Sequence, residues 1–378
     1  MYHVKTMNKI SKIGLAELDD RFEISDTMEH EDAILVRSAK LHDYDFPAEL
    51  LCIARAGAGV NNIPLDRAAE AGIVVFNTPG ANANGVKELT IAALLLASRK
   101  ISQGITWVKE QAAAGAAVAA VVEKGKAAYV GPEIQGKTLG VVGLGAIGVL
   151  VANAAAALGM QIVGYDPFLS VQHALNLTPG VKVVSTLEEL YGQADYISLH
   201  LPMTPETKGT LNDAAFAAMK DGVRIVNLAR GELVDTEALK AALASGKCAA
   251  YVTDFPNSET AAMEGVVAIP HLGASTPESE DNCAMMAARQ VRDYLDNGNI
   301  VNSVNLPVLS MAWAAKNRVC VLTKGADAAA IAAAVPAVAS ASKTRGEYGY
   351  FLLDTDAQVD TDAIAALPGV LRVRVLHQ

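Results

Sequence analysis

The amino-acid sequence predicts an α/β protein, with two parallel-sheet domains followed by a small α+β domain at the C-terminus. Three observations support this class. Short apolar runs alternate with helical patterns from residue 33 to about residue 90. Further apolar runs follow at similar spacing between residues 138 and 271, and a glycine-rich turn ends the first of them. Beyond Pro307 the pattern changes to β-α-β-β-α-β, which is typical of a separate α+β unit.

The first domain contains predicted strands that are short, continuous apolar runs, as expected for strands buried on both faces of a parallel sheet. A Pro near the start and a Gly at the end mark its first helix. The expected strands are 33–38, 51–57 and 73–79, and the expected helices are 64–72 and 86–100. This part of the chain has no glycine-rich nucleotide motif of its own.

The segment 139-LGVVGLGAIG-148 is the most informative motif of the chain. Its apolar run ends in Gly143, Gly145 and Gly148, and the next run, 161-QIVGYD-166, ends in Asp166. In a strand–turn–helix–strand unit, the first glycine permits the tight turn, the second lets the backbone approach a pyrophosphate, and the third lets the helix pack close to the sheet. The motif therefore predicts a dinucleotide-binding, Rossmann-like domain.

Asp166 favours NAD over NADP as the cofactor. Its place after the second strand suits an acid that binds the ribose hydroxyls. It would repel a 2′-phosphate, and residues 167–169 supply no Arg or Lys to compensate. The predicted strands of this domain are 139–143, 161–166, 195–202, 223–229, 249–255 and 266–271, and a helix is expected over 278–298.

We divide the chain into three domains, of which the first two are Rossmann-like or flavodoxin-like parallel-sheet domains. Residues 1–95 and 290–307 form the first, 96–289 form the NAD-binding domain, and 318–378 form a small ferredoxin-like α+β domain. In this last domain the strands are 318–322, 336–343, 348–354 and 370–376, and the helices are 327–335 and 358–367.

Composition and charge exclude several classes of protein. The net charge of −10 and the lack of a basic block argue against a nucleic-acid partner. The four cysteines are scattered, which predicts a reducing compartment, and no residue cluster has metal-site spacing, so we expect no metal. The N-terminus lacks the apolar core of a signal peptide, and the Ala-rich stretch 111–122 is too short to span a bilayer. We therefore expect a cytoplasmic protein with no membrane partner, in which 111–122 is a helix packed against its neighbours.

Three ionisable residues follow predicted strands of the NAD-binding domain, namely Arg230, Glu259 and His271. Ligands bind at the carboxyl ends of the strands in such sheets, so these side chains are candidates for catalysis. During oxidation of an alcohol, His271 would take the hydroxyl proton, and hydride would pass to the nicotinamide ring. Glu259, if paired with His271, would stabilise the imidazolium. Arg230 would bind an α-carboxylate through two parallel hydrogen bonds.

From about Arg37 to Pro307 the chain resembles the D-isomer-specific 2-hydroxyacid dehydrogenases. The segments that carry the resemblance are 55-RAGAGVNNI-63, 77-NTPGANANGVKEL-89, 139-LGVVGLGAIG-148, 198-SLHLPMTPETKG-209, 225-IVNLARGELVD-235, 251-YVTDFP-256, 269-IPHLGAST-276 and 302-NSVNLP-307. The family's catalytic Arg and His fall on Arg230 and His271. Glu259 lies 29 residues after Arg230, the usual interval for the family's Glu. The interval from Glu259 to His271 is shorter than in many members of the family, and Glu264 is the competing candidate.

The resemblance also implies which residues bind the cofactor. Asp254 would contact the nicotinamide carboxamide, and the other residues would line the cofactor cleft. The expected cofactor-binding residues are Gly143, Gly145, Ala146, Ile147, Gly148, Asp166, His200, Pro202, Thr207, Leu228, Ala229, Arg230, Asp254, His271 and Gly273.

By the same resemblance, the first domain is the substrate-binding domain. Backbone N–H groups of residues 58–60 would bind the substrate carboxylate, and two arginines at strand ends would contact a phosphate. The expected substrate-binding residues are Arg37, Arg55, Ala58, Gly59, Val60, Asn84, Arg230 and His271.

The resemblance implies NAD-dependent oxidation of 3-phospho-D-glycerate to 3-phosphohydroxypyruvate, which opens serine biosynthesis. Arg37, Arg55 and the C-terminal domain favour this phosphorylated substrate. A glyoxylate, hydroxypyruvate or D-lactate-type reductase on the same scaffold is the alternative. An NAD-sensing, corepressor-like binding protein is a third hypothesis. The family also implies a homo-oligomer, either a dimer or a tetramer.

The C-terminal domain resembles ACT domains in the order of its elements. ACT domains can bind small effectors such as serine. The segment 323-TKGADAA-329 lacks the Asn and the Pro-Gly of serine-binding loops, so serine inhibition is not expected from its sequence. Pairing of subunits is the alternative role.

Overall fold

The computed structural model describes residues 1–378 and divides the chain into two compact units. One unit contains residues 1–82 and 277–378, and the other contains residues 83–276. The chain therefore passes between the units next to two long helices, α3 (Ala83–Ser98) and α11 (Pro277–Asn297), and each helix stays whole within one unit. The domain boundaries expected from the sequence, at residues 95 and 290, fall inside these two helices.

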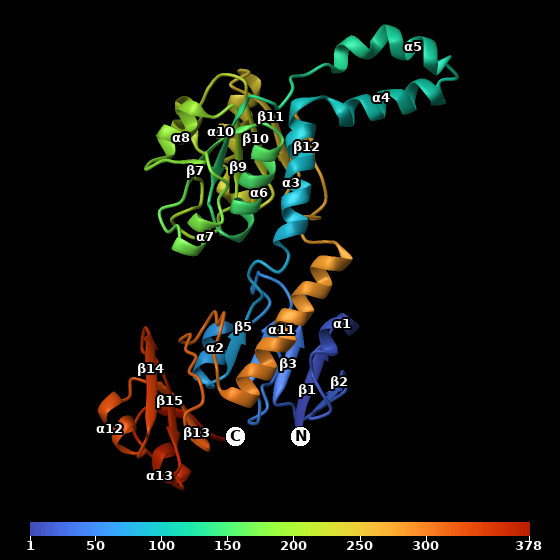
Figure 1. The fold of residues 1–378 in the computed structure, drawn as a ribbon. Helices are drawn as coiled ribbons and strands as arrows, with labels where there is room; N and C mark the ends of the chain where they lie inside the picture. The colour runs from blue at the N-terminus through green and yellow to red at the C-terminus, as the bar shows by residue number, and fades with distance from the viewer. The chain divides into compact units, whose positions relative to one another are not determined.

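The unit 83–276 is built on a parallel sheet of seven strands in the order β12-β11-β10-β9-β6-β7-β8 (Figure 1). The strands are β6 (Thr138–Val142), β7 (Gln161–Tyr165), β8 (Lys182–Val183), β9 (Tyr196–Leu199), β10 (Val223–Asn227), β11 (Cys248–Thr253) and β12 (Val266–Ala268). The chain builds the sheet outward from β6 in one direction and then from β9 in the other. This reversal places a topological switch point at the carboxyl ends of β6 and β9, where ligands bind in doubly wound sheets.

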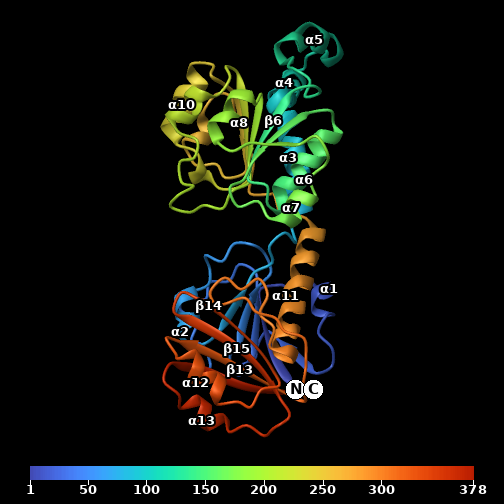
Figure 2. The same ribbon diagram turned by 60° about the vertical axis from the view of Figure 1, so that its left-hand side comes forward.

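Helices cover both faces of this sheet, which explains why its strands are continuous apolar runs. Neighbouring residues of one strand point to opposite faces, so Val141 joins the core beneath α3 and α6 (Ala146–Ala157), whereas Val142 joins the core on the other face. That second core is covered by α8 (Leu187–Gln193), α9 (Asp213–Ala218) and α10 (Thr236–Ala244). Figure 2 shows α3 and α6 on one side of the sheet and α8 and α10 on the other. The short helix α7 (Val171–Leu175) follows β7.

A helical arm leaves this unit between α3 and β6. It consists of α4 (Ile101–Ala113), α5 (Val118–Gly125) and the 3₁₀ turn η1 (Lys126–Tyr129), and neither helix has a buried residue. The expectation of one packed helix over 111–122 is therefore wrong. The chain breaks at Gly115, whose φ is +74°, and the two helices pack against each other and η1 rather than on the sheet (Figure 1).

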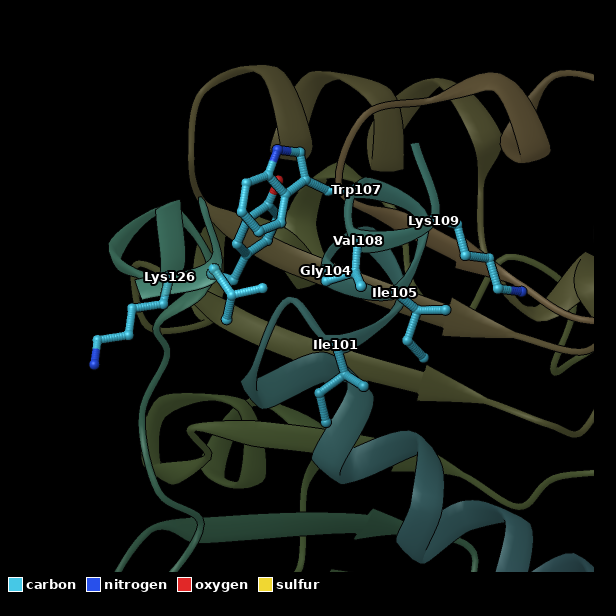
Figure 3. A pocket seen from close by; sticks show the side chains of 9 residues that line it. Ile101, Gly104, Ile105, Trp107, Val108, Lys109 and Lys126 are labelled. Carbon is cyan, nitrogen blue, oxygen red and sulfur yellow. The ribbon is translucent and has the colours of Figure 1, made fainter. Parts of the chain in front are cut away.

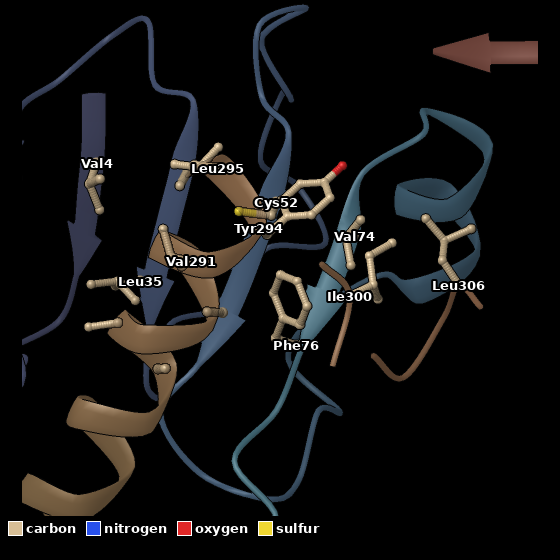
Figure 4. Close-up of a cluster of buried hydrophobic side chains, with 14 of the residues drawn as sticks. Val4, Leu35, Cys52, Val74, Phe76, Val291, Tyr294, Leu295, Ile300 and Leu306 are labelled. Carbon is tan, nitrogen blue, oxygen red and sulfur yellow. The ribbon is translucent and has the colours of Figure 1, made fainter. Parts of the chain in front are cut away.

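The other unit begins with a five-stranded parallel sheet in the flavodoxin-like order β2-β1-β3-β4-β5. Its strands are β1 (Tyr2–Met7), β2 (Phe22–Ser25), β3 (Ala33–Val36), β4 (Cys52–Arg55) and β5 (Val74–Phe76), with helices α1 (Lys12–Leu15) and α2 (Leu65–Glu70). Helix α11 packs on this sheet, and Figure 4 shows its Val291, Tyr294 and Leu295 among side chains of the strands. The two parallel-sheet domains expected from the sequence are thus present.

The C-terminal residues of the same unit form a separate antiparallel sheet in the order β14-β15-β13-β16. The elements are β13 (Asn317–Lys324), α12 (Ala328–Ala333), β14 (Ala339–Arg345), β15 (Tyr348–Thr355), α13 (Thr361–Ala365) and β16 (Val370–His377), which confirms the β-α-β-β-α-β prediction. One face of this sheet packs on α12 and α13, and the other face joins the core around α11.

Buried arginines join the antiparallel sheet to the end of α11. Arg318 and Asp354 form an ion pair of 2.7 Å, and both side chains are fully buried. Arg318 also donates to the carbonyl of Asn297, and Arg374 donates to the carbonyls of Tyr294 and Leu295. The last carbonyls of a helix have no partner within the helix. The C-terminal sheet therefore caps α11 and belongs structurally to its core.

Candidate active site

The glycine turn has the geometry that its sequence predicts. Gly143 has a φ of +94°, and a Cβ built there would lie 2.6 Å from the carbonyl oxygen of His200. A Cβ on Gly148 would lie 1.9 Å from the carbonyl oxygen of Gly143, so the helix α6 could not approach β6 with any other residue. A Cβ on Gly145 would meet nothing within 4 Å. The middle glycine therefore faces open space, which is where a pyrophosphate would lie.

Helix α6 begins at this open space. Its N-cap residue, Gly145, supplies no side-chain hydrogen bond to the first turn, which includes Ala146 and Ile147. The first N–H groups of a helix have no partner within the helix and carry partial positive charge, so they attract an anion. Asp166 is held beside the turn, because its carboxylate accepts hydrogen bonds from the backbone of Leu144 at 2.9 Å and of Phe168 at 2.8 Å.

Asp254 provides a second test of whether these residues fit a nicotinamide dinucleotide. It follows β11, is 1% exposed, and accepts a hydrogen bond from the backbone N–H of Gly273 at 3.0 Å. Its other oxygen, Oδ1, is buried without a partner. Burial raises the pKa of Asp254, while the Gly273 N–H and the charge of His271 act in the opposite direction. An unpartnered buried acceptor of this kind suits the N–H of a carboxamide.

Two segments after β9 also belong to the predicted cofactor cleft. The imidazole Nε2 of His200 lies 2.9 Å from Ser198 Oγ, and burial lowers the pKa of His200 to about 4, which keeps the ring neutral. The Thr207 hydroxyl donates to the carbonyl of Pro202 at 2.6 Å and fixes the turn that follows. Both segments lie at the carboxyl end of β9, at the switch point of the sheet.

Asn227, which the sequence did not single out, organises the end of β10. Its buried side chain accepts a hydrogen bond from the N–H of Ala229 and donates to the carbonyl of Arg230. Leu228 lies between Asn227 and Ala229 in the chain, is 7% exposed, and packs into the core beneath α3. The backbone that carries Arg230 is therefore fixed. The signal was available, because Asn227 is a polar residue that directly follows the buried apolar residues Ile225 and Val226.

Phe255 lies beside both Arg230 and His271, and its place there was not predicted from the sequence. The Arg230 guanidinium carbon lies 5.2 Å from the centre of the Phe255 ring. The His271 ring lies 4.3 Å from the same centre, tilted by 46°. His271 is exposed in this unit, and Arg230 is half-buried. The predicted base and the predicted carboxylate-binding residue thus share one aromatic neighbour.

Neither candidate glutamate contacts His271 in the structure. Glu259 is exposed, and its Oε1 lies 3.4 Å from Lys240 Nζ. Glu264 precedes β12, whereas His271 follows it, so these two residues flank opposite ends of the strand. The structure therefore leaves the choice between Glu259 and Glu264 as a prediction.

The predicted phosphate-binding arginines are adjacent in the other unit. Arg37 follows β3, and Arg55 ends β4. Arg55 Nε donates to the carbonyl of Arg37 at 3.2 Å. Arg37 also forms a 2.6 Å ion pair with Glu280, with both side chains more than 40% exposed. An exposed pair of this kind contributes only about 0–1 kcal/mol, so another anion can replace the glutamate.

The loop after β4 carries the remaining substrate candidates of this unit, Ala58, Gly59 and Val60. Gly57, whose φ is +143°, starts the loop, and its N–H donates to Thr78 Oγ1 at 2.7 Å. Asn77 Nδ2 donates to the carbonyl of Ala58 at 2.8 Å. Asn84 lies in α3 of the unit 83–276, where its Nδ2 donates to Glu88 Oε1 at 2.9 Å.

Comparison with known proteins agrees with this geometry. Residues 91–273 match the family model described as D-isomer specific 2-hydroxyacid dehydrogenase, NAD binding domain. The unit 83–276, which contains these residues, is therefore similar to the NAD-binding domain of this family. No helix of the structure has the length and apolar character needed to cross a membrane.

Most of the chain is similar to proteins named D-3-phosphoglycerate dehydrogenase. It is 38% identical to that of Rattus norvegicus over 291 residues, which cover 75% of this chain and 52% of the rat protein. It is 36% identical to that of Bacillus subtilis, covering 82% of this chain and 60% of the relative. The chain thus spans just over half the length of these relatives. A solved structure of NAD⁺-bound 3-phosphoglycerate dehydrogenase of Entamoeba histolytica matches with a TM-score of 0.61 and 27% identity, covering 82% of this chain and 99% of that one.

Proposed function

We propose that the protein oxidises 3-phospho-D-glycerate to 3-phosphohydroxypyruvate with NAD, the first step of serine biosynthesis. The observation that carries the proposal is the pair formed by Arg230 and His271 around Phe255, at the carboxyl edge of an NAD-binding sheet. An arginine and a histidine in this place suit a substrate with a carboxylate next to a hydroxyl. The names of the curated relatives support the same substrate.

Each group has a role that follows from its chemistry. Bound NAD supplies the acceptor for the hydride, and the turn at Gly145, the carboxylate of Asp166 and the unpartnered oxygen of Asp254 would hold it. Arg230 binds the substrate carboxylate with two parallel N–H groups. The hydroxyl proton of the substrate moves to a ring nitrogen of His271 as the carbonyl forms.

Glu259 is the carboxylate that we propose to stabilise the protonated His271. It would have to leave Lys240, and the exposed contact between them is worth only about 0–1 kcal/mol. Glu264 is the alternative. Substitution of each by Gln separates them, because only the partner of His271 should shift the pH dependence of kcat/KM.

Recognition of the phosphate is proposed for Arg37 and Arg55, with backbone N–H groups of residues 58–60 binding the carboxylate. The support is their adjacency at the carboxyl ends of β3 and β4, and the exposed contact of Arg37 with Glu280, which a phosphate can replace. A glyoxylate, hydroxypyruvate or D-lactate-type reductase would not need these arginines. The double substitution Arg37→Ala, Arg55→Ala therefore tests the assignment. It should lower kcat/KM for phosphoglycerate by about 100-fold or more, at about 1.5 kcal/mol per lost contact, and unchanged kcat/KM would refute it.

The protein is further proposed to be a cytoplasmic homo-oligomer, with the helical arm as a contact surface. The arm carries a groove of about 450 Å³. Figure 3 shows the apolar side chains of Ile101, Ile105 and Trp107 that line it. Ile105 is 53% exposed. Exposed apolar patches of this kind mark protein contacts. Ile105→Asp should lower the mass measured by light scattering, whereas Val183→Asp, at a similarly exposed site of the same unit, should not.

The C-terminal sheet is proposed to be an ACT-type domain, on the basis of its β-α-β-β-α-β order. One of its faces already packs on α11, so an effector or a second subunit would use its helices or its free edge strand β14. Initial rates with and without serine distinguish the two roles, since strong inhibition would favour the effector role.

A further inference from the structure

Phe255 lies between the two charged groups on which the proposed reaction depends. Its ring contacts the guanidinium of Arg230 at 5.2 Å and the imidazole of His271 at 4.3 Å. A cation over an aromatic face gains about 0.5–2 kcal/mol, and a tilted pair of rings gains about 0.5–1.5 kcal/mol. Both contacts therefore favour one orientation of each side chain.

The backbone that carries the Phe255 ring is itself restrained. The N–H of Phe255 donates to Thr253 Oγ1 at 3.0 Å, and Thr253 is fully buried at the end of β11. Gly231 lies against the same residue, because a Cβ on Gly231 would be 3.2 Å from the carbonyl oxygen of Phe255. A side chain at residue 231 would therefore press on the Phe255 backbone, and the loop after Arg230 lies close to Phe255.

The two contacting side chains have few other restraints. Arg230 donates one hydrogen bond, from Nη1 to the carbonyl of Ala229 at 2.6 Å. The His271 ring makes no hydrogen bond or ion pair in the structure, and Phe255 is its aromatic neighbour. Loss of the Phe255 ring would therefore free the imidazole to rotate and would remove one of two restraints on the guanidinium.

We propose that Phe255 is a positioning residue that fixes the distance and orientation between Arg230 and His271. The inference rests on the proposed function, because it concerns a substrate whose carboxylate and hydroxyl are held on neighbouring carbons. These two groups must meet Arg230 and His271 at the same time. A displacement of about 1 Å between reacting groups can lower a rate by about 100-fold.

The test compares Phe255→Leu with Phe255→Tyr in the full chain. Leu removes the aromatic face, and Tyr keeps it. For Phe255→Leu we expect kcat to fall by about 10–100-fold and KM for the 2-hydroxy acid to rise, because chemistry and carboxylate binding both depend on the spacing. The dissociation constant of NAD should stay at its wild-type value, and the melting temperature should fall by only a few degrees, as the loss of two such contacts implies. Phe255→Tyr should restore kcat to within about threefold of wild type.

Several results would overturn the inference. Wild-type values of kcat and KM in an active Phe255→Leu variant would show that the ring positions neither group. Equal losses of activity, NAD binding and melting temperature in Phe255→Leu would show a structural role. Recovery of all three in Phe255→Met, which fills a similar volume without an aromatic face, would show the same. The absence of NADH formation by the wild-type chain with any 2-hydroxy acid would instead overturn the proposed function, and this role with it.

Discussion

Alanine at Gly148 and alanine at Gly145 should have opposite effects, although the two glycines are three residues apart. At Gly148 the new Cβ would lie 1.9 Å from the carbonyl oxygen of Gly143. The first turn of α6 would have to move by about 1.5 Å before this contact became an ordinary one. Overpacking of this kind costs about 1–3 kcal/mol. The melting temperature should therefore fall by about 2–10 °C.

At Gly145 the new Cβ would meet no atom within 4 Å, and the φ of −75° suits alanine. Replacing glycine there reduces the entropy of the unfolded chain by about 0.4–1 kcal/mol, so the unliganded protein should be as stable as wild type or slightly more stable. The same methyl group would occupy the space proposed for the pyrophosphate. We expect the affinity for NAD to fall by about 10-fold or more, a loss of about 1.4 kcal/mol.

Two measurements on each variant separate these effects. Melting temperature without NAD reports the folding cost, and titration calorimetry with NAD reports affinity. Gly145→Ala should bind NAD more weakly without a lower melting temperature. Gly148→Ala should show a lower melting temperature in the absence of NAD. Undiminished NAD affinity in Gly145→Ala would refute the placement of the pyrophosphate at this turn, and an unchanged melting temperature in Gly148→Ala would refute the packing argument.

Three further predictions concern charge. Because burial lowers the pKa of His200 to about 4, from about 6.5 in the unfolded chain, stability contributed by its neutral form is present above about pH 6.5 and is lost as pH falls toward 4. By pH 5 the loss should be about 2 kcal/mol in wild type and absent in His200→Gln, as judged from melting temperatures across this range. Asp354→Asn leaves the buried guanidinium of Arg318 without its counter-charge and should lower the free energy of unfolding by about 3–5 kcal/mol. The double substitution Arg318→Met, Asp354→Leu should recover most of this loss. Equal melting temperatures for Asp354→Asn and wild type would argue against a stabilising ion pair. Asp166→Ala should lower kcat/KM for NAD by about 10-fold and reduce the preference over NADP, and an unchanged preference would contradict its role at the ribose.

The sequence was sufficient to predict those strands and helices whose apolar residues form a regular pattern along the chain. Strands β3 to β7 and β9 to β11 were predicted because they are apolar on both faces, and α6 because glycines with distinct roles bracket its start. Strands β1 and β2 were missed. Only Val4 of β1 and Phe22 of β2 are buried, so neither strand shows the continuous apolar run of a buried strand.

The helical arm shows why an apolar stretch alone does not predict burial. The Ala-rich residues 111–122 suit a packed helix by composition. Gly115, with positive φ, ends α4 and lets the chain reverse into α5, and the apolar residues then lie on an exposed hairpin. The glycine was visible in the sequence, but what covers a helix depends on tertiary packing, which a local pattern does not contain.

The candidate site was predictable where a residue follows a strand directly. Arg230, Asp254 and His271 all follow strands, so the direction of the sheet places them at one edge. The environment of Glu259 was not predictable, because it lies in an irregular loop and contacts Lys240 from α10. The role of Phe255 depends on two partners that are 25 and 16 residues away in the chain, a relation that only the fold reveals.

The most direct test of the proposed function is the formation of NADH by the full chain with a panel of 2-hydroxy acids, with and without a phosphate group. The proposal predicts the highest kcat/KM for 3-phospho-D-glycerate, and a loss of about 1,000-fold or more when His271 is replaced by Ala, since general base catalysis contributes about 10²–10⁴-fold. Faster turnover of an unphosphorylated acid would contradict the substrate. Undiminished NADH formation by His271→Ala would contradict the site itself.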